Sequence, residues 1–109
     1  MKEIKAVIQP FMLNKVIEAL RAIAELPGIT ISHVQGYGGT HGKDANVDLI
    51  EAIDKVKLEI VVSESMVEKV VQIITSNAHT GNTGDGKIFI YPASDVVKIR
   101  TGERGETAI

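Results

Sequence analysis

The sequence of 109 residues predicts an α+β domain in which an antiparallel sheet carries two helices on one face. Several short segments alternate apolar and polar residues, which is typical of strands with one buried face. Two longer segments repeat apolar residues at the spacing of an amphipathic helix. The strand segments that precede the two helices, residues 4–8 and 56–60, have similar patterns, which indicates two similar halves.

The first half predicts a strand, a helix and a second strand. Residues 4–8 alternate in polarity and form the first strand. An apolar stripe over residues 13–24 predicts a helix, which Pro27 and the following glycine end. Residues 29–36 alternate again and are rich in β-formers, so we expect a second strand that stops at the next glycines.

The periodic pattern fails after the second strand. Four glycines interrupt residues 36–42, and no element of normal length fits from about residue 37 to 55. Residues 47–53 fit at most a short helical turn. An insert of this length is usually functional or mobile, so we expect a long flexible loop.

The second half repeats the order strand, helix, strand. Residues 56–62 alternate strictly, and residues 65–78 carry a second apolar stripe. Ser65 and Glu68 have the spacing of a capping box, which predicts that this helix starts there. Residues 87–91 are expected to form the next strand.

The remaining pattern completes a ferredoxin-like plan. Residues 96–100 predict a short additional strand, so the order is βαββαβ followed by one strand, in a single domain over residues 1–109. With both helices on one face, the other face of the sheet needs a cover. Val7 and Val61 lie on that face, and burying it between subunits is the simplest solution, which predicts a homo-oligomer.

The composition excludes several classes of function. The net charge is -2 and aromatic residues make up 4%, so neither the charge nor the stacking surface for nucleic acid is present. The absence of cysteine excludes thiol nucleophiles and zinc–thiolate sites and fits a reducing compartment. No segment is long and apolar enough to span a bilayer, so we expect a cytoplasmic protein without direct membrane insertion.

Residues 80–87 are rich in glycine and end in a lysine. Three glycines within seven residues let the backbone turn its N–H groups toward one point, and Lys87 adds a positive charge. That combination suits an anion such as a phosphate. Asp-Gly and Thr-Gly are also ordinary turn dipeptides, so a simple turn before a strand is the other interpretation of this stretch alone.

Five segments of the chain resemble the PII signal-transduction family. They are Ile-Gln-Pro-Phe at 8–11, Gln-Gly-Tyr-Gly at 35–38, residues 55–62, the glycine stretch at 80–89, and Arg-Thr-Gly-Glu within 99–103. The resemblance extends over nearly the whole chain apart from residues 39–54. The glycine stretch and the Arg-Thr-Gly-Glu sequence are specific in combination.

The resemblance implies a homotrimer of ferredoxin-like subunits with an adenine nucleotide, ATP, ADP or AMP, in each cleft between neighbours. The glycine loop would donate N–H groups to the phosphates, and cations would reach them from the neighbouring end of the cleft. The residues implied in nucleotide binding are Thr30, Ser32, Gly36, Tyr37, Gly38, Val61, Gly84, Asp85, Gly86, Lys87, Lys98 and Arg100. The family also implies a regulator that docks residues 39–54 on a membrane transporter or a metabolic enzyme.

The chain departs from the family where the long loop begins. Typical members have Arg-Gln-Lys-Gly there, and the glutamine helps to hold Mg²⁺ and 2-oxoglutarate, whereas this chain has Gly-Thr-His-Gly at 39–42. Thr40 can still ligate Mg²⁺, but 2-oxoglutarate sensing by the usual route is not expected. Lys55 matches the lysine that pairs with the oxo-acid and can serve another small anion, such as bicarbonate. The loop has no tyrosine after Tyr37, which excludes uridylylation in its familiar form.

Three hypotheses for the function remain open. We favour a regulatory binding protein that is not an enzyme. A slow nucleotide hydrolase would need a positioned water and Mg²⁺. A metal-tolerance trimer resembling CutA shares the fold, and a metal site in the long loop would draw on His41, Asp44 and Asp48.

Overall fold

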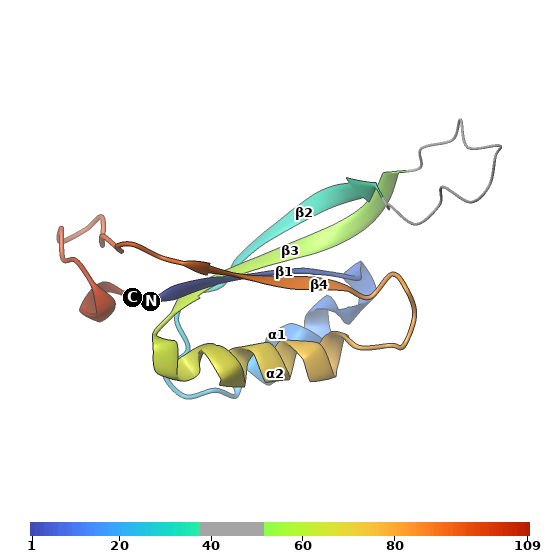
Figure 1. Cartoon of the computed structure of the whole chain (residues 1–109), viewed down its shortest axis with the longest axis horizontal. Helices are drawn as coiled ribbons and strands as arrows, with labels where there is room; N and C mark the ends of the chain where they lie inside the picture. Colours follow the sequence, from blue (N-terminus) through green and yellow to red (C-terminus); the bar gives the residue numbers. More distant parts are fainter. Residues whose placement is uncertain (38–51) are drawn as a thin grey trace.

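A computed structural model describes residues 1–37 and 52–109 of the chain. It contains one four-stranded sheet in the order β2-β3-β1-β4, with all neighbouring strands antiparallel. Figure 1 shows that two helices lie on the same face of this sheet. The strands are β1 (Lys2–Ile8), β2 (Thr30–Tyr37), β3 (Ala52–Val62) and β4 (Gly86–Pro92), and the helices are α1 (Leu13–Arg21) and α2 (Val67–Ala78). The predicted α+β class and ferredoxin-like arrangement are confirmed.

The hydrophobic core lies between the sheet and the two helices. β1 and β3 bury alternate residues, as their sequence pattern predicts, and α1 and α2 bury residues at helical spacing. The largest fully buried side chains are Ile4, Ile8, Val16, Leu20, Val56, Leu58, Ile60, Val62, Val70 and Ile74. Within the described residues, neither helix has the length and hydropathy needed to cross a bilayer.

Each helix follows a short 3₁₀ turn, Pro10–Met12 before α1 and Glu64–Met66 before α2. The predicted capping box is wrong, because Met66 and not Ser65 is the N-cap of α2, and no side chain of residues 1–37 or 52–109 caps the helix. The Ser65 hydroxyl lies 3.2 Å from the Ser63 hydroxyl instead. α1 ends at Arg21, earlier than its apolar stripe predicts.

β3 is longer than predicted and forms a hairpin with β2. It begins at Ala52 and pairs with β2 as far as Tyr37. Residues 52–55, which we expected in the loop, therefore belong to the stem of this hairpin. Residues 38–51 lie outside the described part of the chain, together with most of the helical turn expected at 47–53.

The predicted additional strand at residues 96–100 is wrong. Val97 forms an isolated bridge with Arg104, and the chain turns between them. The Lys98 N–H donates to the Glu103 carbonyl at 2.8 Å, inside the same turn. The backbone of this C-terminal segment satisfies its hydrogen bonds locally, so its short alternation does not add a strand to the sheet.

The sheet face opposite the helices, which we call the open face, carries apolar side chains. Val7 and Val61 are half-buried on it, and Phe89 and Tyr91 are each 41% exposed. The ammonium of Lys5 lies 4.9 Å from the centroid of the Tyr91 ring. Exposed aromatic and branched side chains on one sheet face are a surface suited to a further protein contact.

Candidate functional site

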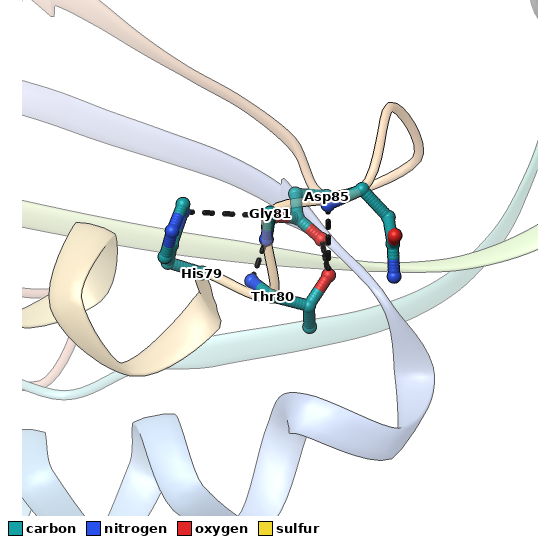
Figure 2. Close-up of polar contacts among 5 residues, drawn as sticks. His79, Thr80, Gly81 and Asp85 are labelled. Carbon is teal, nitrogen blue, oxygen red and sulfur yellow. Dashed lines mark hydrogen bonds and ion pairs between the residues drawn. The ribbon is translucent and has the colours of Figure 1, made fainter.

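The glycine-rich stretch forms the loop that connects α2 to β4. Asp85, near the end of this loop, turns its carboxylate back toward the start (Figure 2). Its Oδ2 accepts the N–H groups of Thr80, at 2.7 Å, and Gly81, at 2.9 Å. Its Oδ1 accepts the Thr80 hydroxyl. The loop is therefore organised around a carboxylate of its own.

These hydrogen bonds lower the pKa of Asp85 below its ordinary value. The largest cause is the bond from the Thr80 hydroxyl, followed by the bond from the Thr80 N–H, while desolvation opposes the shift. The Nδ1 of His79 lies 3.7 Å from Asp85 Oδ2 and lowers the pKa by the smallest amount. Asp85 is therefore a carboxylate at neutral pH.

Two further N–H groups of the loop donate to acceptors within it. The N–H of Asn82 donates to the Thr80 hydroxyl, and the N–H of Asp85 donates to the Asn82 carbonyl, both at 3.3 Å. The N–H groups of Thr83 and Gly84 meet no acceptor among residues 1–37 and 52–109. These two groups are the loop donors that remain for an anion.

Gly86 is required by the sheet at the exit of the loop. Its φ is +103°, a conformation that residues with a side chain rarely adopt. A Cβ at this position would lie 1.7 Å from the carbonyl oxygen of Val7. The next residue, Lys87, pairs in register with Val7 and so belongs to the open face.

Lys55 connects β3 to the glycine loop. Its ammonium donates to the Gly84 carbonyl at 2.5 Å. Gly36 lies beside the same side chain, because a Cβ there would be 3.7 Å from Lys55 Cγ. The structure thus brings Gly36, Lys55 and Gly84 together at one end of the sheet, where the hairpin stem meets the loop.

Gln9 is a neighbour of the loop that the sequence-based site prediction missed. A Cβ on Gly84 would lie 2.6 Å from Gln9 Nε2, so the amide group packs directly against this glycine. Gln9 follows the last residue of β1 and precedes Pro10. The polar side chain between a strand end and a proline is the one signal in the sequence from which this position could have been predicted.

A second group of predicted residues lines a pocket of about 340 Å³ at the other end of the open face. Thr30 and Val61 lie in its wall, together with Glu59, which is the register partner of Thr30. Val96 and Ile109 from the C-terminal segment also line it. Glu59 was missed because an outward-facing charge in a strand usually indicates a solvated side chain.

Lys98 and Arg100 lie in the C-terminal segment, far from the glycine loop along β4 (Figure 1). The ammonium of Lys98 lies 3.7 Å from the Glu103 carboxylate, and Arg100 is exposed in the following turn. The glycine loop enters β4 at Gly86, whereas the C-terminal segment leaves it at Pro92. Within one chain, Lys98 and Arg100 therefore lie too far from the glycine loop to contact the same ligand.

The remaining predicted residues are spread along β2 or lie beyond the described chain. Ser32 pairs in register with Lys57, and Tyr37 is 64% exposed at the end of the strand. Those that lie outside the described residues are Gly38, Thr40, His41, Asp44 and Asp48. Within the described residues, no group of three or more His, Cys, Asp or Glu side chains is placed to hold a metal ion.

Comparison with known proteins identifies the family. A family model described as Nitrogen regulatory protein P-II matches residues 1–103. The chain belongs to the PII family. The PII proteins of Azospirillum brasilense and Synechocystis sp. are 43% and 44% identical to it over 114 and 113 aligned residues, and both matches cover all of each chain. A crystal structure of Arabidopsis thaliana PII bound to citrate matches at 41% identity with a TM-score of 0.83, over 99% of this chain and 91% of that chain.

Membership of the PII family confirms the resemblance that the sequence motifs indicated. The relatives are named as regulatory proteins, which agrees with a signalling role. The family model that matches residues 1–103 is that of PII, the family behind the hypothesis that we favoured over a CutA-like trimer.

Proposed function

We propose that this PII protein binds an adenine nucleotide, ATP, ADP or AMP, in clefts between the subunits of a homotrimer. Through residues 39–54 it regulates a membrane transporter or a metabolic enzyme in the cytoplasm, and it is not itself an enzyme. The observation that carries the proposal is the division of the predicted site into two halves at opposite ends of β4 (Figure 1). A second subunit that places its C-terminal segment beside the glycine loop completes the site.

The glycine loop is the phosphate half of the proposed site. It offers the N–H groups of Thr83 and Gly84, and Lys87 adds a full charge on the open face. Lys87 forms no ion pair with another described residue, so its ammonium is available to a phosphate. A polyphosphate has several negative charges, and Lys98 and Arg100 of a neighbouring subunit supply the additional cations.

The pocket that contains Thr30 and Val61 is the base and ribose half. Its volume of about 340 Å³ is in the range of small-ligand sites. The Glu59 carboxylate in its wall adds an acceptor for the exocyclic amino group of adenine. Ser32 lies one outward-facing position further along β2, between this pocket and Gly36.

We further propose that Lys55 receives a small anion as a co-effector. In the free chain its ammonium holds the Gly84 carbonyl, so an anion bound there competes with that bond and alters the glycine loop. The Arabidopsis PII structure contains citrate, which is a small polycarboxylate; bicarbonate is a second candidate. The usual route for 2-oxoglutarate is not expected, because Thr40 replaces the glutamine, although its hydroxyl can ligate Mg²⁺.

Calorimetric titration tests the proposed nucleotide site. Wild-type protein, Lys87→Ala and the control Lys69→Ala, an exposed lysine on α2, are each titrated with ATP, ADP and AMP, with and without bicarbonate or 2-oxoglutarate. We expect binding at one site per subunit in wild type. Lys87→Ala should weaken binding about tenfold or more, because a hydrogen bond to a charged group contributes roughly 1.5–3 kcal/mol.

The control variant should bind as wild type does, because Lys69 lies on a helix away from the loop. Wild-type protein that binds none of the three nucleotides, or equal weakening by both lysine substitutions, would contradict the proposal. Release of inorganic phosphate from ATP, measured in the same samples, tests the slow-hydrolase alternative.

A further inference from the structure

The hydrogen bonds around Asp85 join the two ends of the glycine loop. The donors, Thr80 and Gly81, follow His79, the C-cap residue of α2, whereas Asp85 immediately precedes the first residue of β4. Figure 2 shows the carboxylate facing the Thr80 backbone and hydroxyl together. Successive N–H groups that converge on one point form a pocket for an anion, and here the anion belongs to the protein.

We propose that Asp85 is a positioning residue of the nucleotide site, which clamps the start of the glycine loop to its end without contacting the phosphates. The identity of the ligand rests on the function proposed above. The clamp itself is present in the free chain. It leaves the N–H groups of Thr83 and Gly84 as the donors that a phosphate meets.

The charge of Asp85 argues against direct contact with a phosphate. The bonds from Thr80 keep the pKa of this carboxyl low, so it is negatively charged at neutral pH and repels a phosphate in direct contact. Its two oxygens already accept three donors from within the loop. His79, at 3.7 Å, is 70% exposed and adds little to holding the carboxylate.

The position of Gly86 explains how the clamp acts on the site. The strand begins there in register with Ile8 of β1, and its backbone lies so close to that strand that a Cβ would be 1.7 Å from the Val7 carbonyl oxygen. Asp85 ties this fixed point to the end of α2. The clamp therefore sets the path of the backbone from residue 82 to 84 and the place where Lys87 enters the open face.

A charge argument and a positioning argument predict opposite signs for Asp85→Asn. If the carboxylate acts only as a nearby negative charge, Asp85→Asn strengthens nucleotide binding, and high salt reduces this increase in affinity. If it acts as a clamp, its removal weakens binding, and the loss persists at high salt. We expect ADP affinity, titrated in EDTA at low and at high salt, to fall about tenfold or more, because hydrogen bonds to a charged acceptor are lost.

Threonine variants test the same clamp without changing the charge. Thr80→Val removes the hydroxyl that Asp85 accepts and should weaken ADP binding severalfold, and Thr80→Ser should restore most of that loss. The double variant Thr80→Val with Asp85→Asn should be no weaker than Asp85→Asn alone, because both changes break one interaction. Thr75→Val is the matched control, since its hydroxyl donates to the Val71 carbonyl within α2 and, among the described residues, to no atom of the glycine loop.

Amide hydrogen exchange tests the clamp independently of any nucleotide. In the free protein, Asp85→Asn should accelerate exchange at Thr80 and Gly81, and Thr80→Val should accelerate it at Gly81, with circular dichroism confirming that the fold is retained. Unchanged exchange, or tighter ADP binding by Asp85→Asn, would overturn the proposal. Weakening seen only with Mg²⁺ would also overturn it, because Asp85 would then hold the metal. Fast exchange in the variants, with no ADP bound by wild type, would retain the clamp and refute the nucleotide function.

Discussion

At the scale of single residues, two glycines of the same loop are required for different reasons. A Cβ on Gly84 would meet the end of the Gln9 side chain, which can move, whereas a Cβ on Gly86 would meet the Val7 backbone at a positive φ. The family resemblance implied both as residues of the nucleotide site. The role of Gly86 in the sheet was not predictable, because it depends on which strand pairs with β4.

Replacing Gly86 with alanine should destabilise the fold. The positive φ alone costs roughly 1–3 kcal/mol, and the contact with Val7 forces a shift of the strand as well. Gly28→Ala is the control, because among the described residues nothing beyond its chain neighbours lies within 4 Å of the added Cβ, and its φ is not in the left-handed region. Its effect should stay within about 0.5 kcal/mol. Denaturant unfolding measures both. Equal stabilities of the two variants would refute this role of Gly86.

The lowered pKa of Asp85 predicts how the loop responds to acid. A carboxyl whose pKa is lower in the folded protein contributes stability that is complete above its ordinary pKa of 3.8 and is lost as pH falls through the folded value. The amide resonances of Thr80 and Gly81 should therefore remain constant on acidification to about pH 4 and change only below it. A transition complete well above pH 4 would contradict this role of Asp85.

At the scale of elements, the strands and helices of the core were predictable because the spacing of apolar residues in the sequence matches the spacing of buried residues in the structure. β1 and β3 bury every second residue, and both helices bury one stripe. The stem at 52–55 was not predictable, because its pairing with β2 and not its own pattern makes it a strand. In the C-terminal segment, alternation over a few residues predicted a strand. The backbone forms a turn there instead, because its hydrogen bonds are made locally.

The link between β3 and the glycine loop gives a prediction at the same scale. Lys55→Met keeps the length of the side chain but removes its bond to the Gly84 carbonyl. Nucleotide affinity should fall severalfold, since a hydrogen bond contributes about 1 kcal/mol, and any effect of bicarbonate on that affinity should disappear. Lys15→Met, on the exposed side of α1, is the control. A full bicarbonate effect in Lys55→Met would exclude Lys55 as the anion site.

At the scale of the whole molecule, the two halves of the candidate site are separated by the length of β4. The sequence predicted the residue types in both halves, through the glycine stretch and the family resemblance. It did not reveal that Lys87 and Arg100 lie apart in one chain, because the segment after β4 turns through its own local hydrogen bonds, where the sequence pattern predicted a strand. The open face, with Phe89 and Tyr91 on it, is the surface on which a second subunit is expected to pack.

Subunit mixing tests most directly whether the nucleotide site is shared between chains. Lys87→Ala and Arg100→Ala each remove one cation from a different half, so each homotrimer should bind ADP weakly. Both proteins should have about three times the monomer mass of 11.7 kDa in light scattering. When the two are unfolded together and refolded at equal amounts, chance pairing around a closed ring should give about a quarter of the clefts both cations. Calorimetry should then detect about that fraction of wild-type sites. A mixture that binds no better than either variant alone, although mixed trimers have formed, would contradict a site shared between subunits.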